Sequence, residues 1–446
     1  MLDLIIRGGQ VVTPGGVLPL DIGIEGGRVR VLDPEIGEAA RADHDAGGLH
    51  ILPGLVDVHV HFNEPGRSDW EGLRSGTSAL LAGGGTTFAD MPLNSHPPLL
   101  DAAVFAAKLA AAQAHAHADF AFWGGLIPLN LERLPELAGA GVIGFKAFMS
   151  GSGIAEFPAA DEATLHAGMR QAAALGLPVA VHAESDELTG RLSAQLNRPG
   201  ASWRDYLNSR PVQAELEAIR LALTLARETG CRLHVVHVSS GEGAALIAQA
   251  RAEGTDVSAE TCPHYLSFTD EDLERLGAAL KCAPPLRSQA VQNQLWAAVI
   301  GGDIQTIGSD HSPCSPDLKT SRSPFEVWGG IPGVQSSLPA LLTHGRRHGL
   351  TLLRLAELTA QAPARRFRLA GKGEISVGFD ADLALVDLGV SARLDASELL
   401  NRWPETSPYV GQTLTGRVVS TWLRGRPVYA GGKIDFGVHG RLLRPA

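Results

Sequence analysis

The chain has 446 residues with 38 basic and 48 acidic side chains, which gives a formal net charge of −10. This mildly acidic balance offers no basic stripe that could neutralise phosphates, so we expect no nucleic-acid partner. No segment reaches the roughly 18 uninterrupted apolar residues that a membrane span needs, and the N-terminus lacks the layout of a signal peptide. We therefore expect no membrane association and a cytoplasmic location.

Both ends of the chain are rich in short β-prone runs separated by glycine. Residues 1–52 contain runs such as Asp3-Leu-Ile-Ile-Arg7 without helical periodicity, and residues 375–446 return to this pattern in Asp382-Leu-Ala-Leu-Val-Asp387. Two β-rich ends around a different middle predict one small β-sandwich domain assembled from both termini. Residues 1–52 would form its first part and residues 375–446 its second.

The middle of the chain, residues 53–374, alternates between strand-like and helix-like segments. Helical spacing of apolar residues marks stretches such as 160–175, 213–228 and 241–253. The strand-like segments are eight apolar runs, at 54–62, 86–91, 119–126, 144–149, 178–184, 232–239, 256–262 and 304–309. Eight repeats of strand and helix predict an α/β fold, a (β/α)₈ TIM barrel, as the catalytic domain. A doubly wound open sheet is the alternative.

The most informative segment ends the first of these strands. His59 and His61 are two residues apart, and in a strand such side chains point to the same face, so the pair can hold one cation. Imidazole suits zinc and other divalent transition ions. Two core histidines are the alternative interpretation. A second pair with this spacing, His115 and His117, lies in an Ala-rich helical stretch where such residues do not face each other, so we expect a solvated helix end there.

Polar side chains recur at the ends of further strands of the expected barrel. They are Lys146 on the fourth strand, His182 on the fifth, His237 on the sixth and Asp310 on the eighth. Because the working groups of such barrels stand at the C-terminal ends of the strands, we expect all of them to converge with the first-strand histidines as a metal site. His234, at an odd offset from His237, should point to the opposite face, toward the outer wall of the barrel.

Lys146 is unusual in such a set because an ammonium group is repelled by a divalent cation and has no lone pair to donate. Burial near positive charge lowers the pKa of a lysine. The neutral amine can then react with carbon dioxide to form a carbamate, whose anionic oxygens can bridge two metal ions. We therefore expect a carbamate at Lys146. An ordinary lysine paired with a carboxylate is the alternative.

On these residues the chain resembles the cyclic-amide hydrolases of the amidohydrolase superfamily, which include dihydroorotases, hydantoinases and allantoinases. The resemblance extends from Pro53-Gly-Leu-Val-Asp-Val-His59 to Gly378-Phe-Asp-Ala-Asp-Leu383. It implies a centre of two divalent metal ions per subunit. In that centre the more buried ion would be bound by His59, His61 and Asp310, the more exposed one by His182 and His237, and both by carboxylated Lys146 and a hydroxide. The resemblance also implies that Asp310 is catalytic, because it would orient the hydroxide and pass its proton to the leaving ring nitrogen.

Within that family the details are similar to the allantoinases, which open (S)-allantoin to allantoate in purine catabolism. The similar segments are 61–67, 90–95, 152–157, 260–266, 281–287 and 328–335. Dihydroorotases place an arginine where this chain has Asn63, and hydantoinases carry a tyrosine shortly after the bridging lysine, which this chain lacks after Lys146. Dihydroorotase or hydantoinase activity is the first alternative. A catalytically silent, dihydropyrimidinase-like scaffold is the second, and the six filled ligand positions argue against it.

A flat ureide ring rich in N–H and C=O groups should be bound by polar and backbone groups of the loops at the barrel rim. The candidate substrate contacts are Asn63, Asn94, Ser288, Gly329, Gly330 and His264. His264 could equally have a packing role. The proposed metal ligands accept zinc, and also cobalt, manganese or iron. The resemblance further implies a homotetramer.

Overall fold

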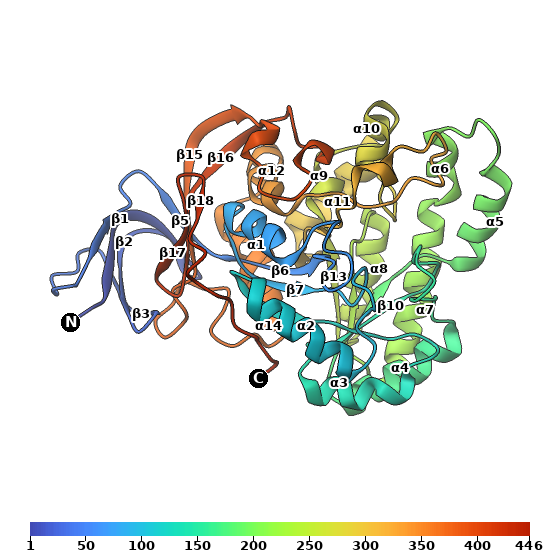
Figure 1. The fold of residues 1–446 in the computed structure, drawn as a ribbon, viewed down its shortest axis with the longest axis horizontal. Helices are drawn as coiled ribbons and strands as arrows, with labels where there is room; N and C mark the ends of the chain where they lie inside the picture. Colours follow the sequence, from blue (N-terminus) through green and yellow to red (C-terminus); the bar gives the residue numbers. More distant parts are fainter.

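The computed structural model describes residues 1–446 and shows two parts side by side (Figure 1). One part is a sheet built from both chain ends, and the other is a set of parallel strands surrounded by helices. None of the helices combines the length and the apolar character needed to cross a bilayer.

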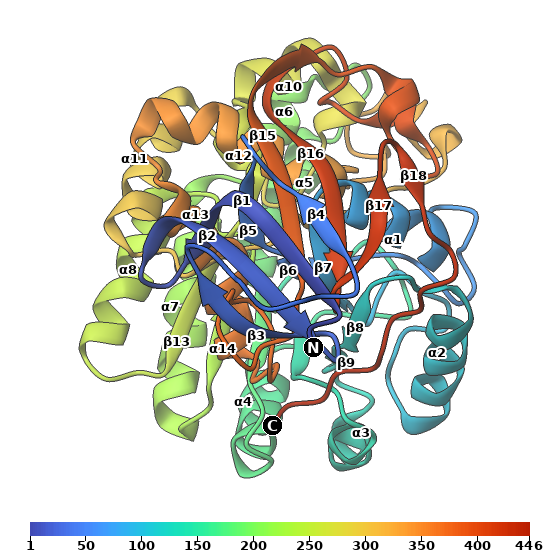
Figure 2. The ribbon, with the colours of Figure 1, turned by 90° about the vertical axis from the view of Figure 1, so that its left-hand side faces the viewer.

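The terminal sheet has nine strands. In hydrogen-bonded order they are β18 (Lys433–Ile434), β17 (Arg426–Ala430), β16 (Thr413–Leu423), β15 (Leu383–Arg393), β5 (His50–Pro53), β1 (Leu4–Thr13), β2 (Gly16–Glu25) and β3 (Arg28–Asp33), with β4 (Asp43–Asp45) also beside β1. Figure 2 shows the N-terminal strands β1, β2 and β5 next to the C-terminal strands β15 and β16. Strand β5 joins the two halves, because it pairs with β1 on one side and β15 on the other. Both termini therefore build this sheet, as the sequence predicts.

The terminal sheet encloses an apolar core of its own. Side chains from both halves, such as Ile6, Ile22, Leu383 and Trp422, pack into one buried cluster. The pairing of β1 with β2 shifts register between Ile6 and Gly9. Such an irregularity bends a strand and increases its twist.

The second part contains the eight expected strands, each overlapping its predicted run. They are β6 (Leu55–Val60), β7 (Gly85–Asp90), β8 with β9 (Asp119–Phe122 and Gly124–Gly125), β10 (Phe145–Phe148), β11 (Val179–His182), β12 (Leu233–Val235), β13 (Val257–Thr261) and β14 (Thr306–Ile307). All neighbouring pairs among them are parallel. The third strand is interrupted only at Trp123, so β8 pairs with β7 while β9 pairs with β10.

The ring closes between the first and the last strand. Val60 at the end of β6 forms a parallel bridge with His311, shortly after β14. The N–H of His61 also donates to the carbonyl of His311 at 2.8 Å. The eight strands therefore form a (β/α)₈ barrel, and the open-sheet alternative is wrong.

Helices cover the barrel on the outside (Figure 1). They are α1 (Leu73–Ala82), α2 (Ala102–His115), α3 (Leu134–Ala140), α4 (Glu162–Ala174), α5 (Asp186–Leu196), α6 (Trp203–Ser209), α7 (Val212–Thr229), α8 (Gly241–Ala252), α9 (Pro263–Ser267), α10 (Asp270–Leu276), α11 (Gln289–Gly301), α12 (Ser337–Gly345), α13 (Leu352–Ala356) and α14 (Ala362–Arg366). Since the strands are parallel, side chains that follow their C-terminal ends meet at one rim.

The second His-x-His pair is only partly where the sequence analysis expects it. His115 is the last residue of α2, and its half-exposed ring contacts the carboxylate of Glu64 at 2.6 Å. His117 is buried, and its Nδ1 lies 2.8 Å from the carbonyl of Val438. The expectation of a solvated helix end is therefore wrong for His117, because the C-terminal segment covers it.

Candidate metal centre and active site

The first and last strands bring three predicted ligands together. His59 lies on β6, His61 follows that strand, and Asp310 follows β14. The Nε2 atoms of His59 and His61 lie 3.2 and 3.4 Å from Oδ1 of Asp310. All three side chains are within the distance at which they could share one metal ion. The sequence analysis expects them together because all three stand at the C-terminal ends of barrel strands, and the resemblance implies the same set.

His182 and His237 form the other half of the cluster. His182 ends β11 and His237 lies just beyond β12. Nδ1 of His182 and Nε2 of His237 face each other at 3.1 Å. The two halves adjoin, since the ring centroids of His59 and His237 are 5.5 Å apart. Burial lowers the pKa of both His182 and His237, which favours the neutral imidazole that binds metals.

The outward-facing ring nitrogens are held by other protein groups. Nδ1 of His59 lies 2.6 Å from Oε1 of Glu260, and Nδ1 of His61 lies 2.6 Å from the carbonyl oxygen of Leu93. Nε2 of His182 lies 2.9 Å from Oε2 of Glu184. These acceptors favour an N–H on the outer nitrogen and leave a lone pair on the inner one, which is the tautomer a metal ligand requires.

Lys146 lies on β10 and is fully buried. Its Nζ makes no hydrogen bond, although its charge acts on His182, His237 and Asp310. Burial lowers the pKa of Lys146 to about 8, even though Asp310 and Glu260 act in the opposite direction. The paired lysine of the alternative interpretation is not what the structure contains, because no carboxylate lies within hydrogen-bonding distance of Nζ.

Asp310 is ionised in this environment. Burial alone would raise its pKa, but the neighbouring charge of His59 and a hydrogen bond from His61 lower the pKa below the usual carboxyl range. Asp310 also has a φ of 45°, in the left-handed region. Strained backbone of this kind clusters at functional sites, where the surrounding structure holds it in place.

His234 lies inside the barrel, so its predicted position at the outer wall is wrong. Its Nε2 is 3.4 Å from Oε2 of Glu260, and its ring packs edge-to-face on Phe367 in the barrel interior. The parity argument fails because β12 ends at Val235 and His237 has a φ of 40°. Strand alternation therefore stops before His237, and both histidines face inward.

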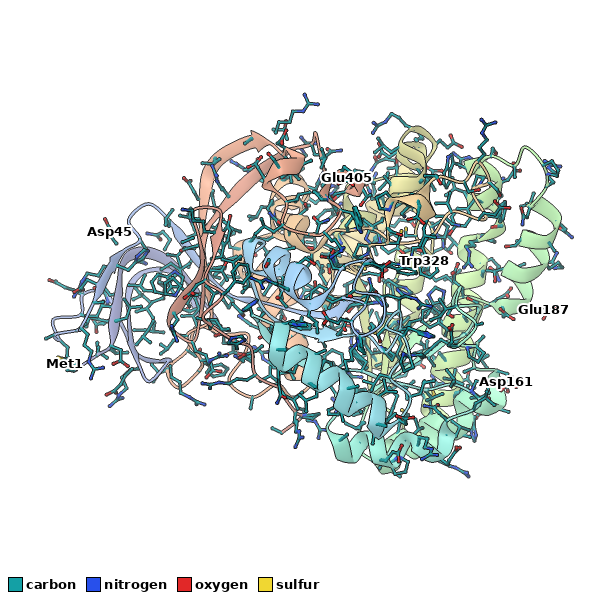
Figure 3. The ribbon with its side chains drawn as sticks, in the orientation of Figure 1. Met1, Asp45, Asp161, Glu187, Trp328 and Glu405 are labelled. Carbon is teal, nitrogen blue, oxygen red and sulfur yellow. The ribbon has the colours of Figure 1, made fainter.

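A cavity of about 480 Å³ opens above the cluster and is lined by 25 residues. His59, His61, His182, His237 and Asp310 form its inner end. The loop around Trp328 forms part of its wall, and Figure 3 shows Trp328 among the barrel elements, away from Met1 and Asp45 on the terminal sheet.

The predicted substrate contacts fall into two groups. Asn94, Gly329 and Gly330 line the cavity, whereas the structure does not place the other three in its wall. Asn63 is buried and donates its amide to the carbonyl of Pro313 at 3.2 Å. His264 is buried, and one of its ring nitrogens lies within 4.8 Å of the ligand atoms of Asp310 and Cys262.

Ser288 is the third of these outlying residues, and it is exposed. It occupies the residue before α11, where an N-cap serine is common. The sequence alone places it after the seventh strand, and it does not show that Ser288 begins a helix outside the rim.

Sequence reasoning missed several residues of the site. Glu260 contacts both His59 and His234. The sequence feature that could have identified it is a carboxylate within an apolar, buried strand. Arg210, Tyr206 and Lys281 line the cavity wall far along the chain from the strand ends. No local pattern marks Arg210 and Tyr206, and the segment 281–287 is recognised by its similarity without any role for Lys281, because all three reach the cavity from a short helix or from loops.

The residues present fit a metal centre. Two imidazole nitrogens 3.1 Å apart, with the outer nitrogen of His182 occupied by Glu184, point their lone pairs at a common position. Lys146 Nζ is buried beside these side chains without a hydrogen-bond partner. Buried polar groups normally have partners, so this cluster is arranged for a group that binds between its side chains.

The comparisons with known proteins agree with this geometry. The model of the amidohydrolase family matches residues 50–428. A protein of Solibacter usitatus named allantoinase is 53% identical over 100% of this chain and 97% of its own length. One of Deinococcus radiodurans with the same name is 54% identical over 100% of this chain and 99% of its own. The solved structure of an L-hydantoinase (dihydropyrimidinase) from Arthrobacter aurescens covers 100% of both chains with a TM-score of 0.96 and 35% identity. The chain belongs to the amidohydrolase family.

Proposed function

We propose that this protein is an allantoinase, which hydrolyses a ring amide bond of (S)-allantoin to yield allantoate. The observation that carries the proposal is the convergence of four histidines, Asp310 and Lys146 at one rim of the barrel, in a chain whose full-length relatives are named allantoinases. A silent scaffold would not need to keep every one of these side chains in place.

The donor set supports two divalent cations, zinc above cobalt, manganese or iron. His59, His61 and Asp310 would hold one ion, and His182 and His237 the other. When bound, such ions would supply a nucleophilic hydroxide, because they lower the pKa of bound water to about 7, and they would polarise the ring carbonyl.

Lys146 would join the two halves as a carbamate. Its lowered pKa makes the neutral amine available, and the amine nitrogen attacks the carbon of carbon dioxide and releases one proton. The anionic product no longer repels a cation. Incorporation of ¹³C-bicarbonate, read as a carbamate resonance by NMR, tests this step.

Asp310 would move the proton during ring opening. Its ionised carboxylate lies at the inner end of the cavity, so it can take a proton from the nucleophile and return it to the leaving ring nitrogen. Asn94, Gly329 and Gly330 would contact the ureide from the cavity wall, because they line it.

A hydantoinase activity is the second candidate, favoured by the fold similarity to the L-hydantoinase from Arthrobacter aurescens. One metal-replete preparation should be assayed on allantoin, hydantoin and dihydroorotate, with metal content measured on the same sample. We expect about two ions per chain and a kcat/KM for allantoin at least tenfold above the others. Equal or faster hydrolysis of either competitor would contradict the allantoinase assignment and leave the barrel unaffected.

We further propose a cytoplasmic homotetramer, as the resemblance implies. Light scattering of the purified protein tests the assembly through its mass, and cell fractionation tests the location. A monomer in solution at micromolar concentration would contradict the tetramer.

A further inference from the structure

The segment from Phe325 to Gly330 forms one wall of the cavity. All six of its residues line the cavity, and it contains no helix or strand. Backbone carbonyls in such a segment need partners from outside it, because it has no ladder of its own. Four of these carbonyls are accounted for by two lysine side chains.

Lys281 donates from Nζ to the carbonyls of Phe325 and Val327. Its ammonium group also lies 4.8 Å from the centre of the Tyr206 ring, a cation–π contact. The backbone of Lys281 takes part as well, since its carbonyl accepts the N–H of Gly330 at 2.7 Å. One residue therefore holds the segment at three points.

Lys319 completes the arrangement from the other side. Its Nζ donates to the carbonyls of Trp328 at 2.9 Å and Gly330 at 2.8 Å, and to that of Ala278 at 3.1 Å. The carbonyls on either side of Gly329 are thus fixed. Gly329 itself is exposed to the cavity and makes no hydrogen bond through its own N–H or C=O.

No carboxylate is among the charged groups that act on Lys281 and Lys319, which is costly for cations removed from water. Burial lowers the pKa of Lys281 to about 7 and that of Lys319 to about 8. Burying an ammonium group that only neutral carbonyls contact contributes little to the stability of a fold. Their cost is explained if the segment they hold has to keep one shape.

We propose that Lys281 and Lys319 are positioning residues for substrate binding, which fix the 325–330 backbone as the wall that receives the part of the substrate pointing away from the metal ligands. The inference rests on the proposed function, because it concerns the same cavity. The two lysines act through Gly329 and its neighbours and do not touch the reacting atoms.

The test compares Lys319→Met and Lys281→Met with Lys433→Met, a matched control on the exposed strand β18 of the terminal sheet. We expect each cavity variant to raise KM about tenfold while kcat stays within threefold and metal content is unchanged. Hydrogen exchange at the amides of Trp328 and Gly330 should accelerate at least tenfold in the substrate-free protein. The control should match the wild type in every measurement.

Wild-type KM and wild-type exchange in both variants would overturn the proposal, as would a loss of kcat or of metal with KM unchanged. If one variant does not fold, the other decides, because each lysine holds different carbonyls. The exchange measurement uses no substrate. Its outcome is therefore independent of whether allantoin is the substrate. KM can be measured on whichever cyclic substrate the enzyme is found to hydrolyse.

Discussion

Two buried lysines show how differently this fold uses the same side chain. Lys146 lies at the mouth of the barrel with no hydrogen-bond partner on its Nζ. Lys372 lies at the seam between barrel and terminal sheet, where its Nζ contacts the carboxylates of Asp119 at 2.6 Å, Asp382 at 2.7 Å and Asp380 at 3.0 Å. Both side chains are almost completely buried.

The difference lies in what surrounds the charge. Burial lowers the pKa of both, but at the seam three carboxylates outweigh it and raise the pKa of Lys372 above its usual value. At the barrel mouth burial prevails, and the pKa of Lys146 falls to about 8. One lysine is therefore a permanent cation that ties two sheets together, while the other loses its proton near pH 8, so that a fraction of it is the reactive neutral amine at neutral pH.

The largest effect is expected from removing the amine at the barrel mouth. Lys146→Ala should lower kcat/KM on the order of 10³-fold or more and release metal, because losing a ligand exceeds the roughly 10- to 100-fold cost of losing a partner behind a ligand. A short-chain carboxylic acid should restore part of the activity by replacing the carbamate oxygens. Metal analysis and initial rates with and without acetate measure both.

Full metal content in Lys146→Ala would contradict the chemical role that distinguishes Lys146 from Lys372. In that case Lys146 would not supply ligand atoms, and its position among the histidines would need another explanation. Lys433→Ala, on an exposed edge strand, provides the control for substitution of a lysine as such.

Removing the cation at the seam should affect stability instead. Lys372→Met removes the one cation that contacts all three carboxylates, although Asp119 keeps Arg424 and Asp380 keeps Arg28, and breaking a buried ion pair typically costs about 3–5 kcal/mol. Chemical denaturation should show that loss, while metal content and kcat/KM of the folded fraction remain within twofold of the wild type. A variant as stable as the wild type would show that the seam does not depend on this charge.

The strand-end residues could be predicted from the sequence because their placement follows from the barrel alone. His59, His182 and Asp310 each come at the end of an apolar run, and parallel strands in a closed ring bring such ends together. The same reasoning located all eight strands, since apolar runs of strand length alternate with helical stretches along residues 53–374. Whether these side chains bind metal remains a separate prediction, for which the metal analysis of the purified protein is the test.

Positions off the regular strands could not be predicted in this way. His234 and His237 both point inward although their offset is odd, because β12 ends before His237 and His237 has a left-handed backbone conformation. A left-handed residue cannot be recognised in a pattern of strand alternation. Ser288 begins a helix where a rim position was expected, and Lys281 reaches the cavity through carbonyls of a segment more than forty residues away. Such contacts depend on loop paths that periodicity does not encode.

Replacing the buried Glu184 should give the smallest effect of the three substitutions. Its carboxylate contacts one cation, Arg210, and the ring of His182. Burial raises the pKa of Glu184, but the charge of Arg210, the hydrogen bond and charge of His182 and the charge of Arg287 together outweigh burial and lower the pKa to about 2, from a usual value of 4.5. The unfolded chain therefore binds a proton more readily, so this contribution to stability is complete above pH 4.5 and is lost as the pH falls toward 2.

The substitution Glu184→Gln removes this titration. Between pH 5 and pH 3 the free energy of unfolding of the wild type should therefore fall by about 2 kcal/mol relative to that of the variant. Calorimetry of both metal-free proteins over this range, with exposed Glu405→Gln as control, measures the slope; a difference independent of pH would mean that Arg210 does not hold this carboxylate ionised.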